Sequence, residues 1–129
     1  MAIEFVNADG KVLVTLPEDS TSFDLGDADL TGVQIVDMVL QGAMFIGTTL
    51  VEALFSETDL YWASFICADC RRAVFRRCDL TGASFSGANL TDSVFDNCVF
   101  SFENGTNAAW FDGADLSNCS FLGSHEEKP

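Results

Sequence analysis

The chain has 129 residues, of which twenty are acidic and six basic, so its formal net charge is −14 at pH 7. This length is typical of a single domain, and the 48% apolar content with twelve phenylalanines excludes a disordered chain. No apolar run approaches the roughly 20 residues of a membrane-spanning helix. The acidity disfavours nucleic acids and anionic membranes as partners, because both are bound through clustered lysine and arginine.

The N-terminal residues and the cysteines point to one compartment. Residues 1–5 lack the basic region and long apolar run of a secretion signal. The five cysteines are an odd number, which favours reduced thiols over a disulfide framework. We therefore expect a cytoplasmic protein.

Residues 1–20 have the pattern of a β-hairpin. The apolar-rich segments 4–6 and 12–16 flank a turn that contains Gly10, and Pro17 ends the second segment. A stack of repeats needs a cover over its first layer, since open strand edges would otherwise promote aggregation. We expect the hairpin to be that cap.

From residue 21 to residue 123 a large apolar side chain recurs at every fifth position. Neither a helix nor a strand keeps a five-residue repeat in register, so the chain must turn once per repeat. Glycine, Asn or Asp often lies two residues after the centre, and these residues accept the left-handed conformation that a type II turn requires. The repeat centres are Leu25, Leu30, Ile35, Leu40, Phe45, Leu50, Phe55, Leu60, Phe65, Cys70, Phe75, Leu80, Phe85, Leu90, Phe95 and Phe100, followed one residue out of phase by Phe111, Leu116 and Phe121.

The repeat itself resembles a known family. The segments Ala-Asp-Leu-Thr-Gly (28–32) and Ala-Asn-Leu-Thr-Asp (88–92) are similar to the pattern Ala-(Asp/Asn)-Leu-X-X of the pentapeptide-repeat proteins. The resemblance implies an all-β fold, a right-handed quadrilateral β-helix of about five coils with four repeats per coil, and no catalytic residues. On this basis we divide the chain into a cap (1–20), a β-helix (21–123) with a loop insertion at 101–107, and a polar tail (124–129).

Columns of stacked residues follow from counting by 20, or by 21 across the insertion. Phenylalanines then stack on phenylalanines, with offset ring contacts between layers. A column of small residues comprises Met38, Thr58, Cys78, Cys98 and Cys119. Buried cysteine packs as a small apolar residue, and thiols in a line do not converge on a zinc ion. We expect no metal and no cofactor.

Six consecutive corners lack Gly, Asn and Asp, which predicts a different turn without a left-handed residue. They carry Glu52, Glu57, Trp62, Cys67, Arg72 and Arg77. The same stretch holds four arginines, Arg71, Arg72, Arg76 and Arg77, which either bind a partner's carboxylates or a phosphate, or pair with stacked carboxylates of the chain. Arg71 has no acidic neighbour in its column and is expected to be the freest of them.

Exposed apolar residues are the second candidate for an interaction surface. Tyr61, Trp62 and Phe102 are expected to wall a notch at Gly82, and such aromatics are enriched at binding hot spots. An outward aliphatic stripe comprises Leu54, Val74 and Val94, and Met44, Ile46 and Ile66 lie on another side. These stripes mark an interface, or reflect only the preference of strand surfaces for β-branched side chains.

The favoured function is a non-enzymatic protein–protein interaction module that presents flat β-helix faces to a protein partner or to a second copy. The family resemblance permits an alternative, a DNA-mimicking protein that protects DNA gyrase, although the arginines interrupt the acidic surface such a mimic needs. A toxin immunity protein is a further alternative. An enzyme is disfavoured, since no carboxylate pair, nucleophile–base set or phosphate loop emerges.

Overall fold

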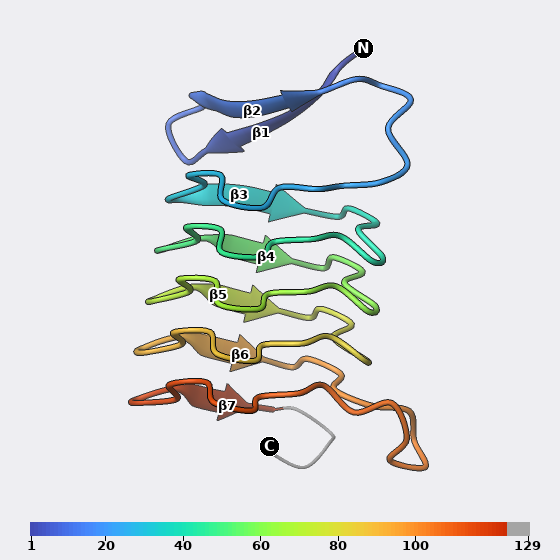
Figure 1. Ribbon diagram of the computed structural model, residues 1–129, viewed down its shortest axis with the longest axis vertical. Helices are drawn as coiled ribbons and strands as arrows, with labels where there is room; N and C mark the ends of the chain where they lie inside the picture. Colours follow the sequence, from blue (N-terminus) through green and yellow to red (C-terminus); the bar gives the residue numbers. More distant parts are fainter. Residues whose placement is uncertain (124–129) are drawn as a thin grey trace.

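The computed structural model describes residues 1–123, and the predicted polar tail 124–129 lies outside them. The protein is all-β, with a single seven-stranded sheet in the order β2-β1-β3-β4-β5-β6-β7. Figure 1 shows the coils stacked along the long axis, beneath the hairpin at the N-terminal end. The strands are β1 (Ile3–Asn7), β2 (Val12–Leu16), β3 (Val33–Val36), β4 (Leu54–Ser56), β5 (Val74–Arg76), β6 (Val94–Asp96) and β7 (Ser120–Leu122). None of the described segments forms a helix long and apolar enough to cross a membrane.

The hairpin β1–β2 caps the first coil, as predicted. Strand β1 pairs antiparallel with β2 and, through Val6 and Asn7, antiparallel with β3. The side chain of Phe5 is only 1% exposed, because it packs onto the first layer of the core. The hairpin therefore covers both the backbone edge and the apolar end of the solenoid.

Beyond the cap the chain winds as the predicted solenoid, with β3–β7 stacked in parallel. The bridges from Asp24 to Trp110 mark four complete coils, and a partial coil follows, slightly fewer than the five expected. We number the four faces of the coil in chain order. Face 1 is centred on Leu25, Phe45, Phe65, Phe85 and Phe111; face 2 on Leu30, Leu50, Cys70, Leu90 and Leu116; face 3, which holds β3–β7, on Ile35, Phe55, Phe75, Phe95 and Phe121; and face 4 on Leu40, Leu60, Leu80 and Phe100.

The core is a stack of phenylalanine and leucine layers. Every repeat centre from Leu30 to Phe95 is 0% exposed. Phe65 stacks on Phe85 with ring centroids 4.6 Å apart and planes 3° apart, and it meets Phe75 edge-on at 5.5 Å. Burial of each such side chain contributes about 1.5–3 kcal/mol before the entropy of ordering is subtracted. The inward positions are thus used for packing.

The predicted register across the insertion is wrong. Phe111 stacks on Phe85 at 5.1 Å and Phe121 pairs with Phe95, so the fifth layer follows the fourth after 26 residues and not after 21. The spacing between Phe100 and Phe111 therefore contains six inserted residues beyond one regular repeat. Because the loop adds six residues, each later centre lies one face earlier than the count by 21 placed it.

The prediction of a different turn at the six unusual corners is also wrong. All six are left-handed, with φ between 50° and 61° from Arg77 to Glu52. Their backbone N–H groups donate to the adjacent coil, as when Trp62 donates to the Thr81 carbonyl at 2.9 Å and Arg72 to the Thr91 carbonyl at 3.0 Å. A left-handed conformation costs a non-glycine residue about 1 kcal/mol or more. The hydrogen bonds between coils hold the corners in that conformation whatever the residue.

Candidate protein-binding surface

Three of the four arginines pair with carboxylates in the adjacent coil. These exposed pairs arise because the columns align residues of opposite charge at one strand spacing, about 4.8 Å. The intramolecular ladder, one of the two alternatives for the arginines, is therefore present. The pairs are Arg72 Nε with Glu52 Oε2 at 3.8 Å, Arg76 Nε with Asp96 Oδ2 at 3.6 Å, and Arg77 Nη1 with Glu57 Oε1 at 3.8 Å.

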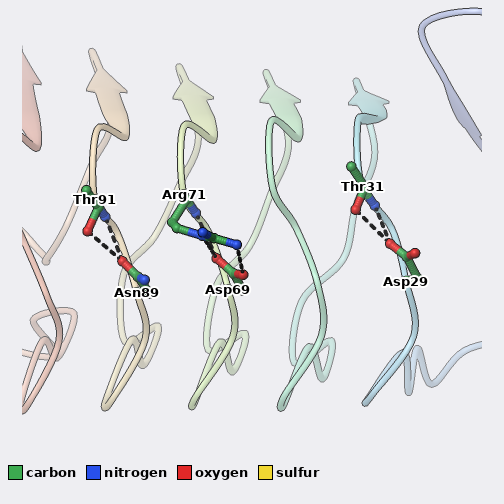
Figure 2. Close-up of polar contacts among 6 residues, drawn as sticks. All are labelled: Asp29, Thr31, Asp69, Arg71, Asn89 and Thr91. Atoms are coloured by element: carbon green, nitrogen blue, oxygen red, sulfur yellow. Dashed lines mark hydrogen bonds and ion pairs between the residues drawn. The ribbon is translucent and has the colours of Figure 1, made fainter.

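Arg71, expected to be the freest arginine, is the most tightly bound. Its Nε and Nη2 donate to the two carboxylate oxygens of Asp69, each at 2.8 Å (Figure 2). Asp69 belongs to a row on face 2 in which Asp or Asn accepts from the residue two positions later, as Asn89 does from the Thr91 hydroxyl at 2.7 Å. The Arg71 guanidinium lowers the pKa of Asp69. The column count missed this partner because it is local in sequence.

The aromatic cluster of Tyr61, Trp62 and Phe102 is brought together at the corner between faces 4 and 1. The Tyr61 ring lies 6.1 Å from that of Phe102 and 5.8 Å from that of Trp62. Trp62 and Phe102 remain 44% and 43% exposed. The expected notch is not open, since the Trp62 indole lies directly over Gly82 and fills it. The surface is a raised aromatic edge.

The aliphatic stripe lies on a different face. Leu54, Val74 and Val94 occupy consecutive registered positions on β4, β5 and β6 of face 3. Each is partly buried by its neighbours. The stripe and the aromatic cluster do not share a face, so the predicted interaction residues divide into two separate surfaces.

Several exposed apolar residues were not singled out from the sequence. Trp110, 56% exposed, lies on face 1 in the column that starts with Asp24, whereas a count by 21 places it on face 2. Val39 and Val99 are exposed on face 4, at positions where other repeats carry Asp or Asn. The sequence contained a signal for Val39 and Val99, because a β-branched residue at a position where other repeats carry Asp or Asn departs from the repeat pattern.

The cysteines are free thiols with structural contacts. Cys98 Sγ donates to the Phe75 carbonyl at 3.1 Å, and Cys78 Sγ to the Phe55 carbonyl at 3.3 Å. The hydrogen bond with Cys98, together with burial, raises the pKa of the Cys78 thiol. Cys119, expected in the same column, instead contacts Ser93 Oγ at 3.2 Å. Among residues 1–123 no group of three His, Cys, Asp or Glu side chains could hold a metal ion.

The stacked coils and five-residue repeat define a β-solenoid repeat protein. The family described as pentapeptide repeats matches residues 24–60, 53–92 and 63–101, in eight copies. The chain therefore belongs to the pentapeptide-repeat family. Curated proteins include no match to it.

The solved structure of HetL shows the same fold. HetL, a pentapeptide repeat protein involved in heterocyst differentiation regulation from the cyanobacterium Nostoc sp. strain PCC 7120, is 20% identical, with a TM-score of 0.67 over 81% of this chain and 49% of HetL. A pentapeptide repeat protein of the Arabidopsis thaliana thylakoid lumen is 31% identical over 78% of this chain and 59% of that one, with a TM-score of 0.45. QnrB1, a plasmid-mediated fluoroquinolone resistance protein, is 20% identical over 78% and 62%, with a TM-score of 0.48. The chain thus spans about half the length of HetL.

Proposed function

We propose that this protein is a non-enzymatic interaction module that binds a protein partner through the aromatic cluster of Tyr61, Trp62 and Phe102. The observation that carries the proposal is that three aromatic rings meet at one corner while two of them stay almost half exposed. Tryptophan and tyrosine dominate the energetics of protein interfaces, because they bury a large area with few rotatable bonds. The family membership is compatible with such a role.

The arginines support the proposal less well. Each of the four already faces a carboxylate of its own chain. A partner's carboxylate or phosphate would have to displace that contact, and the two hydrogen bonds of Arg71 with Asp69 would be lost. Exposed pairs at 3.6–3.8 Å contribute little, so their role is to even out charge between coils.

A capture experiment tests the proposal. Tagged wild type and the variants Trp62→Ala and Phe102→Ala are used to capture partners from cells that express the protein. The matched control is Val36→Ala, which removes an exposed apolar side chain on face 3, away from the cluster. We expect a partner to be retained by wild type and by the control, and lost from both cluster variants. Retention by all four proteins would refute binding through the cluster. A toxin captured in this way would make the protein an immunity protein.

A DNA-mimicking protector of gyrase is the second candidate, and the net charge of −14 is the observation in its favour. A DNA-like surface needs unpaired charges, whereas the arginines partly neutralise Glu52, Glu57, Asp69 and Asp96. A gyrase supercoiling assay separates the two candidates. Inhibition of supercoiling by the purified protein at micromolar concentration would favour the mimic, and an unchanged reaction would exclude it.

A further inference from the structure

The positive charges of the solenoid are confined to one side. Within residues 21–123 the basic side chains are the four arginines, and these occupy faces 2 and 3 with their corners. Face 4 has none. Its outward column runs from Val39 through Asp59 and Asp79 to Val99, joined by consecutive parallel bridges.

On face 4 two carboxylates stack directly on each other. Asp59 and Asp79 are bridge partners in adjacent coils, about 4.8 Å apart along the stack. Like charges at directly opposed positions of a sheet destabilise it. On face 3, by contrast, the stacked charged pair is Arg76 with Asp96, which have opposite charges. On face 2, Asp69 lies between the neutral Thr49 and Asn89. The stacked carboxylates of face 4 therefore lack the opposite charge that Asp96 has in Arg76.

The contacts of these carboxylates are all to neutral donors. Asp59 Oδ2 accepts from Gln41 Nε2 at 2.5 Å, and Asp59 Oδ1 accepts from the Tyr61 N–H at 3.1 Å. Asp79 Oδ1 accepts from the Thr81 N–H at 3.0 Å. Among the described residues no donor reaches Asp79 Oδ2, and Glu103, in the loop beside Phe102, is exposed.

Apolar side chains frame the acidic pair. Val39 and Val99, 68% and 37% exposed, lie at the two ends of the column. Tyr61 is on the same face, two residues from Asp59, and it contacts Trp62 and Phe102. Face 4 and its corner thus combine aliphatic, aromatic and unpaired acidic groups in one surface.

We propose that this surface binds a basic amphipathic segment of a partner protein, an inference that rests on the proposed function and names the partner's chemistry. A lysine or arginine of the segment bridges Asp59 and Asp79 and removes their repulsion. Aliphatic side chains of the segment cover Val39 and Val99, and a second cation lies over the Trp62 ring. Charge complementarity selects this occupant, because an acidic or purely apolar segment would leave the two carboxylates desolvated and unpaired.

Calorimetric titration with synthetic peptides tests the inference. The probe is an 18-residue peptide of leucine and arginine, arranged with one apolar helical face, and a second peptide has glutamine in place of each arginine. The site variant is Asp59→Asn with Asp79→Asn, and the matched control is Asp27→Asn with Asp92→Asn, exposed corner positions away from face 4 that lose the same charge. The asparagines at 59 and 79 can keep the turn contacts, since Asn89 accepts from the Thr91 N–H in the same way.

We expect the arginine peptide to bind wild type and to lose about tenfold or more in affinity for the site variant, against about twofold or less for the control. Added salt should weaken the binding of the arginine peptide to wild type. The affinity of the glutamine peptide for wild type should be lower than that of the arginine peptide by about tenfold or more. Equal losses in the two double variants would overturn the inference, because the attraction would then be to the net charge alone. Failure of the arginine peptide to bind would also overturn it. Equal binding of both peptides, weakened by Trp62→Ala but not by the asparagines, would refute the cation requirement and leave the proposed function standing.

Discussion

The indole of Trp62 lies on Gly82 of the adjacent coil. A Cβ atom at position 82 would come within 2.8 Å of Trp62 Cδ2 and Cε2, and Gly82 has φ of +70°. Two features therefore disfavour a side chain there: the contact with the ring, which leaves no room for a Cβ atom, and the left-handed backbone, which costs a non-glycine residue about 1 kcal/mol. The aromatic edge of the proposed surface exists only because this corner carries no side chain.

Substitution Gly82→Ala should reduce the free energy of unfolding by about 2–3 kcal/mol and displace Trp62. The matched control is Gly42→Ala, at the same corner two coils earlier, with the same φ of +70° and nothing within 4 Å of the added Cβ. The control should lose only about 1 kcal/mol, the cost of the backbone conformation. Urea unfolding measures both losses, and tryptophan fluorescence reports the displaced ring. Equal losses would show that the contact between Trp62 and position 82 carries no energy.

The arginine pairs should differ in strength according to their geometry. Arg71 makes two hydrogen bonds of 2.8 Å with Asp69, whereas Arg72 lies 3.8 Å from Glu52. A double-mutant cycle of Arg71→Ala with Asp69→Asn should give a coupling of about 0.5–1 kcal/mol, because paired, aligned hydrogen bonds exceed a distant exposed pair. The cycle of Arg72→Ala with Glu52→Gln should give about 0.3 kcal/mol or less. A larger coupling for Arg72 would contradict this ranking.

The lowered pKa of Asp69 predicts a pH-dependent contribution to stability. A carboxyl whose pKa is lower in the folded state than in the unfolded state stabilises the fold above its unfolded pKa, about 3.9, and loses that effect as pH falls through the folded pKa. Wild type should therefore be more stable than Asp69→Asn at pH 7, and the difference should shrink as the pH falls below about 4. Unfolding curves of both proteins across this range measure it. A difference that stays constant with pH would show that Arg71 stabilises the neutral carboxyl equally.

The repeat specifies the scaffold, but two local features do not follow from it. The stack of Phe65 on Phe85 follows from counting by 20, because burial of large side chains outweighs every local preference. The left-handed Trp62 corner does not follow from residue type, since a preference of about 1 kcal/mol yields to the hydrogen bond with Thr81. The step of eleven positions from Phe100 to Phe111 fits either two repeats with one inserted residue or one repeat with a six-residue insertion, and the ring stack of Phe111 on Phe85 distinguishes them.

The same reasoning applies to the candidate surface. The meeting of Tyr61 with Phe102 was predictable, because a count by 20 places Phe102 two coils from Trp62, the residue next to Tyr61. The bond of Arg71 with Asp69 was not, since it joins residues on one side of the coil and not residues in one column. The stacked pair Asp59 and Asp79 is visible by counting, yet its importance depends on the absence of arginine from that face, which only the placed side chains make plain.

A buried hydroxyl beside the aromatic corner gives a final prediction. Ser64 Oγ, two residues after Trp62, is buried and has no hydrogen-bond partner among the described residues. Such a group costs about 1–3 kcal/mol of lost hydration, so Ser64→Ala should raise the free energy of unfolding by about 1 kcal/mol. The same change at Ser93, whose Oγ donates to the Leu90 carbonyl at 2.7 Å, should lower it by about 1 kcal/mol. Because both variants remove one hydroxyl from the solenoid, opposite signs in urea unfolding would isolate the effect of hydrogen bonding. A loss at both positions would mean that the Ser64 hydroxyl is satisfied by water in solution, and that the face beside Trp62 is hydrated before any partner binds.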